Sequence, residues 1–307
     1  MAGFIAKRIF SGFITTIFLI TIAFFLMHSI PGGPFSHTED RNVPQSVIDA
    51  VEKKYGLKDP VYIQYFRYMK SIAKGDLGIS FKQQDESVNN LIKTGFPVSA
   101  RVGLLAVLLS VILGIPLGII SAIKRGTWMD MASMIFATIG IAVPSFVIAI
   151  LNLYFFCVIL HLLPTYGLDS WKAYILPVMG LSFHPISYIT RLTRSSMLEV
   201  MRQDYIRTAR AKGVSEFLVV TKHALKNALI PVVTYLGTLI AALLTGSFVI
   251  ERIYSIPGIG RQYVSSIGDR DYSVILGMTV FFGVFVIIAN IVVDVMYAVI
   301  DPRVKFD

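Results

Sequence analysis

Six long runs of uncharged, mostly apolar residues divide the chain, and each is long enough to cross a membrane as a helix. A helix rises about 1.5 Å per residue, so about 20 residues span the roughly 30 Å hydrocarbon core of a bilayer. Lipid cannot satisfy free backbone groups, which favours helices, and the alternating pattern of barrel strands does not occur in this sequence. The predicted spans are residues 9–30, 102–123, 131–160, 173–190, 227–250 and 272–293.

Two of these runs differ from a simple straight span. The run 131–160 is longer than one crossing needs, so we expect it to tilt or protrude. The run 173–190 is the shortest, and Pro177 and Pro185 predict breaks within it.

The first run follows two basic residues, as a signal peptide would. Its apolar stretch is about twice the usual 7–15 residues and no small-x-small cleavage motif follows, so we expect it to remain as a span.

The composition and the distribution of charge support a membrane protein. Hydrophobic residues make up 55% of the chain and charged residues 15%, whereas soluble domains carry about 25% charged residues, so a soluble enzyme is excluded. With the N-terminus inside, the inner segments hold 14 basic residues and the short outer loops hold 4. This bias predicts that both termini are cytoplasmic, and it accounts for much of the net charge of +9 without a nucleic-acid partner. A single cysteine, Cys157, excludes an intrachain disulfide and a cysteine-built metal site.

The region 31–94, which follows the first span, is too long for a simple connection. We expect it to lie outside the membrane and to contain two short amphipathic helices near the membrane face. It could be a cap that packs on the spans or a docking surface for an external partner, and the sequence leaves both open. The two stripes at helical spacing are Val47, Val51 and Tyr55, and Tyr62, Phe66 and Met69.

The segment between the fourth and fifth predicted spans is 36 residues long, with eight basic and three acidic residues. Ala209 and Gly213 lie four residues apart, so on one helix face they would let another surface approach closely. Gly213 is placed to end this helix in a left-handed conformation, and Ser215 to cap the next one. The predicted helix–turn–helix could couple to another protein, or it could be a basic loop beside anionic lipid headgroups.

Two stretches of this segment carry a recognisable motif. Residues 205–213 read Tyr-Ile-Arg-Thr-Ala-Arg-Ala-Lys-Gly, and residues 223–231 read His-Ala-Leu-Lys-Asn-Ala-Leu-Ile-Pro. They resemble the cytoplasmic signature of ABC importer permeases, written Glu-Ala-Ala, three residues, Gly, nine residues, Ile-x-Leu-Pro. Arg207, Thr208 and Lys226 depart from the general Glu, Ala and Pro, and these departures match the peptide-importing branch.

The resemblance covers nearly the whole chain and narrows to the first of the two permease subunits of an oligopeptide or dipeptide importer, with the oligopeptide branch matching best. The further motifs that carry it are Pro31-Gly-Gly-Pro-Phe35, Tyr55-Gly-Leu57, Ser87-Val-Asn89, Gly95-Phe-Pro-Val-Ser99, Thr245-Gly-Ser-Phe-Val-Ile-Glu251, Ile256-Pro-Gly-Ile-Gly260, Arg270-Asp-Tyr272 and residues 294–302.

This resemblance implies an all-α polytopic membrane protein with six transmembrane helices and the type I ABC importer permease fold. The expected parts are an N-terminal span at 1–30, the external region 31–94, a five-helix membrane domain at 95–298 and a cytoplasmic tail at 299–307. The implied partners are a second, homologous permease, two cytoplasmic ATPases that carry ATP and magnesium, and an external peptide-binding protein, lipid-anchored or periplasmic. The implied location is a bacterial or archaeal plasma membrane, and no cofactor is expected in this chain.

The resemblance also assigns roles to residues. The loop around Gly213 would contact an ATPase and carry its movement to the spans. A separate hypothesis, from the turn that ends the fifth span, is an outer gate. No catalytic or metal-binding residue is predicted. The coupling residues are Tyr205, Arg207, Thr208, Ala209, Ala211, Gly213, Ser215 and Glu216, and the gate residues are Glu251, Pro257, Gly258 and Gly260.

The residues of the spans also bear on other possible functions. The sequence has no Gly-x-x-x-x-Gly-Lys-Ser/Thr phosphate loop, and its spans hold almost no charged residues, which disfavours a proton-coupled carrier. We interpret His184, beside Pro185, as a helix break with a hydrogen-bonded imidazole rather than a proton or substrate site. The open alternatives are a dipeptide or nickel- or metal-chelate importer, and an autonomous channel or secondary carrier. An intramembrane enzyme would need clustered His, Asp or Glu, which the sequence lacks.

Overall fold

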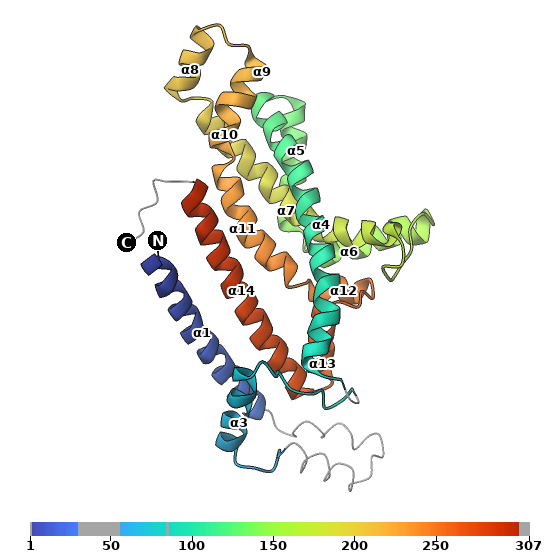
Figure 1. Ribbon diagram of the computed structural model, residues 1–307. Helices are drawn as coiled ribbons and strands as arrows, with labels where there is room; N and C mark the ends of the chain where they lie inside the picture. Colours follow the sequence, from blue (N-terminus) through green and yellow to red (C-terminus); the bar gives the residue numbers. More distant parts are fainter. Residues whose placement is uncertain (1, 30–55, 84–85, 301–307) are drawn as a thin grey trace.

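The computed structural model describes residues 2–29, 56–83 and 86–300, and these residues form an elongated bundle of helices (Figure 1). Within the described ranges there is no strand, and one isolated antiparallel bridge joins Ile79 to Ser87. Five helices make up most of the bundle. They are α1 (Ala2–Ser29), α4 (Val88–Ile123), α7 (Trp171–Val200), α11 (Ile230–Leu244) and α14 (Tyr272–Ile300).

Four of the described helical segments are long and apolar enough to cross a membrane: Ala6–Ser29, Val88–Ile123, Ile230–Ile253 and Tyr272–Val293. A bent pair of helices makes a fifth if it is counted as one span. The predicted span 173–190 lies within α7, which is long enough to cross a membrane but is less apolar than these four segments. The chain is therefore a multi-pass membrane protein, and the count of six spans stays a prediction.

The run 131–160, which was expected to tilt or protrude, does not form one continuous helix. These residues form α5 (Trp128–Ala142), α6 (Ser145–Leu153) and a π-helical turn, η2 (Tyr154–Ile159), and α5 meets the α6–η2 stretch at 105°. Pro144 causes the bend, because a proline disfavours helical geometry in the residue before it. Val143 is accordingly extended, at φ −88° and ψ 126°, and α6 begins directly after Pro144.

The predicted breaks at Pro177 and Pro185 are also wrong, because α7 continues through both. The helix is held from several sides by α4, α5 and α6. Gly114 of α4 lies so close to α7 that a Cβ there would fall 2.8 Å from a side-chain carbon of Ile189. Close packing of this kind outweighs the local preference of proline to end a helix, as neighbouring elements can satisfy the freed backbone groups.

The predicted external region contains one described helix, α3 (Val61–Ala73), which carries the stripe Tyr62, Phe66 and Met69 as expected. The stripe from Val47 to Tyr55 lies outside the described residues. α3 packs through its tyrosines on Phe24 of α1. α4 begins at Val88, well before the predicted span, and Ser87 caps it by accepting a hydrogen bond from the Asn90 amide at 3.1 Å.

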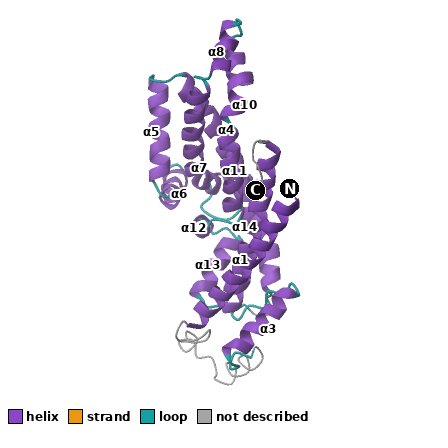
Figure 2. Ribbon diagram, turned by 90° about the vertical axis from the view of Figure 1, so that its left-hand side faces the viewer, coloured by secondary structure: helices purple, strands orange, loops and turns teal. Residues whose placement is uncertain are grey.

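The ends of the bundle carry shorter helices (Figure 2). One end holds α8 (Asp204–Ala211), α9 (Glu216–Leu218), η3 (Val219–Ala224) and α10 (Leu225–Ala228), which lead into α11. The opposite end holds α3 and α13 (Ile259–Gly268), and α12 (Phe248–Ile253) lies between the two ends. α1 and α14 run antiparallel, as shown by Phe24 and Met27 packing on Tyr272 and Leu276.

Candidate coupling segment and gate

Residues 204–228, called the coupling segment below, fold as a short helix, a sharp turn and a second helical stretch, as predicted. Ile206 and Ala209 of α8 are buried against Val219, Val220 and other apolar residues of the same segment and of α7. This core also includes Ala122 of α4 and Met197 of α7, so it fixes the segment to the end of the bundle and gives it a defined surface at the tip of the molecule.

Gly213 makes the turn. Its φ is +78°, the left-handed conformation that favours glycine, and the Gly213 and Val214 amides donate to the carbonyls of Arg210 and Ala209 at 2.9 and 3.2 Å. This pair of bonds is the Schellman arrangement that closes helix ends. The expectation that Ala209 and Gly213 share one helix face is wrong, because Ala209 is buried within α8 while Gly213 lies beyond its end, with no described residue within 4 Å of its Cβ position.

The exposed side of the coupling segment is polar with two aromatic residues. Arg210 holds the far side of the turn through two hydrogen bonds to Glu216, at 2.6 and 3.2 Å, and these bonds lower the pKa of the Glu216 carboxyl. Tyr205 accepts a hydrogen bond from the Asn227 amide group at 2.8 Å. Ser215 precedes α9 but makes no side-chain capping bond, so that part of the prediction is wrong. Phe217 is 75% exposed and was missed by the sequence analysis.

The remaining predicted coupling residues, Arg207, Thr208 and Ala211, are exposed on α8. The structure therefore brings all the predicted residues into one segment, with Ala209 inside it and the others at its surface. An exposed aromatic residue beside a tight turn is typical of a protein–protein contact. Phe217 is identified only by its exposure, since in the sequence it is one aromatic among many.

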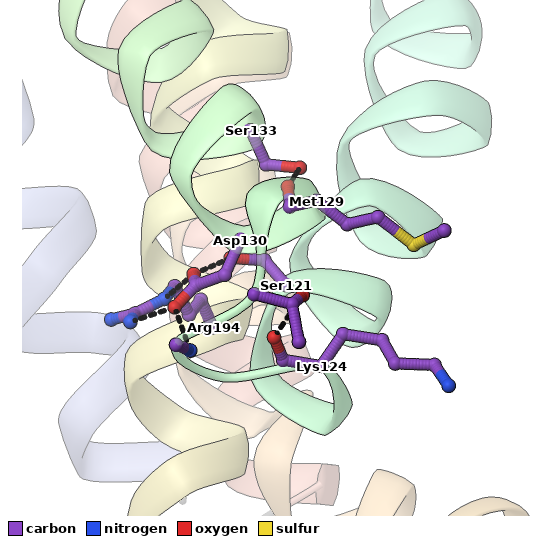
Figure 3. A network of polar contacts seen from close by, with 8 residues as sticks. Ser121, Lys124, Met129, Asp130, Ser133 and Arg194 are labelled. Carbon is purple, nitrogen blue, oxygen red and sulfur yellow. Dashed lines mark hydrogen bonds and ion pairs between the residues drawn. The ribbon is translucent and has the colours of Figure 1, made fainter.

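A buried ion pair lies where α4, α5 and α7 meet (Figure 3). The Arg194 guanidinium donates from Nε and Nη2 to the two carboxylate oxygens of Asp130, at 2.7 and 2.9 Å. The Ser121 hydroxyl and the Gly126 amide also donate to this carboxylate. The network ties the α4–α5 corner to the part of α7 that leads to the coupling segment.

Asp130→Asn is expected to lower the stability of the bundle by about 1–3 kcal/mol, less than for a fully buried pair because Arg194 is partly exposed. An amide cannot accept both guanidinium bonds, so Arg194 loses its charged partner. The midpoint of thermal unfolding in detergent measures the loss. Asp204→Asn is the matched control, because its carboxylate is 95% exposed and 3.6 Å from Arg207, and it should change nothing measurable. If the two variants unfold at the same midpoint, the Asp130–Arg194 pair does not contribute to the stability of the bundle.

The predicted gate residues surround a buried carboxylate. Glu251 of α12 is only 2% exposed; it accepts a hydrogen bond from the Ser99 hydroxyl at 2.6 Å and from the Arg261 amide at 2.9 Å. The Ser99 hydroxyl also accepts a hydrogen bond from the Ile259 amide at 2.9 Å. Ser99 ends one of the sequence motifs, but the sequence did not assign it to the gate. Ser99 lies on α4, so the carboxylate joins α4, α12 and the start of α13.

The two gate glycines allow this close approach. A Cβ on Gly258 would fall 2.4 Å from a carboxylate oxygen of Glu251, and one on Gly260 would fall 3.0 Å from the same oxygen. Pro257 is exposed and takes no part in the network. Figures 1 and 2 place α12 and α13 well away from the coupling segment, so the structure forms two separate clusters rather than one site.

His184 differs from its prediction. α7 does not break there, the imidazole is exposed, and it forms no hydrogen bond within the described part of the chain. Among the described residues no group of three or more His, Cys, Asp or Glu is arranged to hold a metal ion.

The chain is similar to known transport proteins over its full length. Residues 114–306 match the family model "Binding-protein-dependent transport system inner membrane component", and residues 1–103 match the model for the N-terminal part of such membrane components. The dipeptide transport system permease protein DppB of Bacillus subtilis is 47% identical over 99% of this chain and 98% of its own. The oligopeptide transport system permease protein OppB of Escherichia coli K12 is 46% identical over the whole of both chains.

Solved structures share the fold at much lower identity. The MetNI methionine ABC transporter superposes with a TM-score of 0.56 at 19% identity, covering 69% of this chain and 96% of that chain. An amino acid ABC transporter superposes with a TM-score of 0.55 at 14% identity, covering 68% of this chain and 94% of that chain.

Proposed function

Since the chain belongs to the family of binding-protein-dependent transport system inner membrane components, we propose that it is one permease subunit of an ATP-driven importer of oligopeptides. The observation that carries the proposal is the coupling segment, a helix–turn–helix with an exposed polar surface that packs on the ends of α4 and α7 at one end of the bundle. The full-length similarity to OppB and DppB supports peptides as the substrate class.

In this proposal the chain forms half of the translocation pathway and is itself non-catalytic. A second, homologous permease forms the other half, two cytoplasmic ATPases bind ATP and magnesium, and an external protein delivers the peptide. Six spans with both termini in the cytoplasm would put the coupling segment on the ATPase side. The 14 basic residues of the inner segments support this orientation.

The coupling segment would seat in a groove of an ATPase, with Phe217 as an apolar anchor and the Arg210–Glu216 pair keeping the turn in shape. Movement of the ATPase would then pass through α7, which the Asp130–Arg194 pair links to the α4–α5 corner. Glu251, Gly258 and Gly260 would hold the outer gate closed by joining α12 and α13 to α4.

The proposal is tested by co-purifying the tagged chain in mild detergent and reconstituting the complex in vesicles. We expect a second permease and ATPases to co-purify, and a labelled oligopeptide to accumulate only with ATP and the binding protein. Parallel assays with a dipeptide and with a nickel chelate separate the two alternative substrate classes. Accumulation without ATP, by the chain alone, would instead support an autonomous carrier.

Gly258→Ala is expected to reduce uptake several-fold and to lower stability by about 1–3 kcal/mol, because the methyl group would overlap the Glu251 carboxylate and the Ser99 hydroxyl. Uptake and the thermal midpoint of the purified complex are measured together. Gly268→Ala, at the end of α13, is the matched control, since nothing lies within 4 Å of its Cβ position. Wild-type uptake by Gly258→Ala and Gly260→Ala would remove the support for the gate.

A further inference from the structure

One face of α7 is uncovered, and every residue exposed on it is polar. Between Phe183 and Val200 the exposed residues are His184, Tyr188, Arg191, Ser195 and Glu199. Their spacing of four, three, four and four residues puts them on one side of a helix with 3.6 residues per turn. These five residues are called the polar stripe below.

The polar stripe contrasts with the outward faces of the neighbouring helices. All the exposed residues of α4 between Val102 and Ile123 are apolar: Leu104, Leu105, Leu108, Ile112, Leu113, Pro116, Ile120 and Ile123. Such a surface suits lipid. Ionisable side chains within a membrane are costly, and they face a protein interior or a water-filled cavity rather than lipid.

In the part of the chain that the structure describes, His184, Arg191 and Glu199 of the polar stripe have no polar partner. Arg191 and Glu199 take part in no ion pair among the described residues, and His184 forms no hydrogen bond there. Arg194, on an adjacent face of the same helix, is by contrast fully engaged with Asp130. The polar stripe is therefore not part of the network that holds the bundle together.

A second helix widens the polar stripe. The ring of Tyr235 on α11 lies 4.3 Å from that of Tyr188, and Thr238, one turn further along α11, is exposed. The surface thus has hydrogen-bonding groups within the predicted span 173–190, and the charged groups of Arg191 and Glu199 follow its inner end. There it meets a surface hollow of about 370 Å³ lined by Ser195, Leu198, Glu199, Arg202 and Gln203.

We propose that the polar stripe lines the water-filled path that the peptide follows through the membrane. This proposal rests on the proposed function and adds to it the residues that line the path of the substrate. This path holds water and, during transport, a zwitterionic peptide. The ring nitrogens of His184 and the hydroxyl groups of Tyr188 and Thr238 can hydrogen-bond to peptide amides and carbonyls without selecting a side chain. Arg191 and Glu199, eight residues or about 12 Å apart along the helix, carry the charges that match the two peptide termini.

The test uses single cysteines in the assembled importer. The one native cysteine, Cys157, is buried and is replaced by alanine. Cysteine is then placed at 184, 188, 191 or 195, and each complex is treated with a charged, membrane-impermeant methanethiosulfonate from the coupling-segment side. The cysteine thiolate attacks the reagent, forming a mixed disulfide and releasing methanesulfinate, and this thiolate does not form in lipid. Ile112→Cys is the matched control, because Ile112 is 64% exposed on the apolar face of α4.

We expect the four stripe cysteines to react at least about tenfold faster than the cysteine at 112, and an excess of peptide to slow them. Reaction at the control rate would overturn the proposal, since the polar stripe would then be sealed by lipid or by the second permease. If a cysteine variant fails to assemble, the test uses the unmutated complex, in which diethyl pyrocarbonate should modify His184. The absence of this modification would also overturn the proposal. Labelling does not depend on uptake, so fast labelling without ATP-driven uptake would reject the proposed function alone.

Discussion

Replacing Gly213 with Asp is expected to reduce ATP-driven peptide uptake by about tenfold or more, while the chain still inserts and assembles. A loss of about 1.4 kcal/mol in coupling between ATPase and permease is enough for a factor of ten. No described residue lies within 4 Å of the Cβ position, so the new side chain clashes with none of them. The effect would come from a negative charge placed at the tip that meets the ATPase. Uptake by reconstituted vesicles measures it, with ATPase activity recorded in parallel.

Two further substitutions at position 213 separate charge from backbone strain. Asn has nearly the same shape as Asp and tolerates the left-handed conformation about as well, so Gly213→Asn should keep most of the uptake. Val is β-branched and is strained at φ +78°, so Gly213→Val should disturb the turn itself. Normal uptake by Gly213→Asp would count directly against the coupling role. Equal losses with Asn and Asp would assign the effect to shape rather than charge.

Replacing Glu251 with Gln is expected to lower the stability of the complex by about 1–3 kcal/mol and to reduce uptake strongly. The carboxylate faces hydrogen-bond donors, Ser99 Oγ and the Arg261 amide, at its two oxygens. An amide presents one NH₂ group instead of an oxygen, so at least one buried donor would face another donor and lose its partner. The thermal midpoint and the uptake rate of the same preparation measure the two effects.

A double-mutant cycle with Ser99→Ala tests whether the two side chains act as a unit. Residues in direct contact show coupling of about 0.5–3 kcal/mol, so the double variant should lose less stability than the two single variants added together. Simple additivity would show that the serine contributes nothing through this carboxylate. Wild-type behaviour of Glu251→Gln would remove Glu251 from the gate proposal.

The local parts of this structure were the predictable ones. The turn at Gly213 and the two helical stretches around it follow from a glycine at a helix end and from apolar spacing over a few residues. The helix at Tyr62, Phe66 and Met69 follows from the same spacing. Each of these depends on residues close together in the chain, where side-chain periodicity alone carries the information.

The pairs that join distant helices could not be predicted in the same way. Asp130 and Arg194 are 64 positions apart and Ser99 and Glu251 are 152 apart, and nothing in a single sequence assigns one to the other. Both charged residues of the first pair also lie close to the ends of apolar runs, where they resemble ordinary charges flanking a span. Their pairing depends on how α4, α5 and α7 pack.

The prolines show why local rules gave opposite results at similar residues. Pro144 ends α5, and the chain changes direction there, whereas Pro177 and Pro185 lie inside a continuous α7. The difference is in the surroundings, since α7 is held by α4, α5 and α6 along its length. A single sequence contains the prolines but not the contacts that decide whether each one bends the chain.

The 105° bend between α5 and the α6–η2 stretch also constrains the topology through parity. If the N-terminus and the coupling segment lie on the same side of the membrane, the chain must cross an even number of times between them. α1 and α4 supply two crossings. The bent pair and α7 must then either both cross or both turn back. A chain in which only one of them crossed would carry the eight basic residues of the fourth-to-fifth connection to the wrong side, so the bent pair and α7 can only be assigned together.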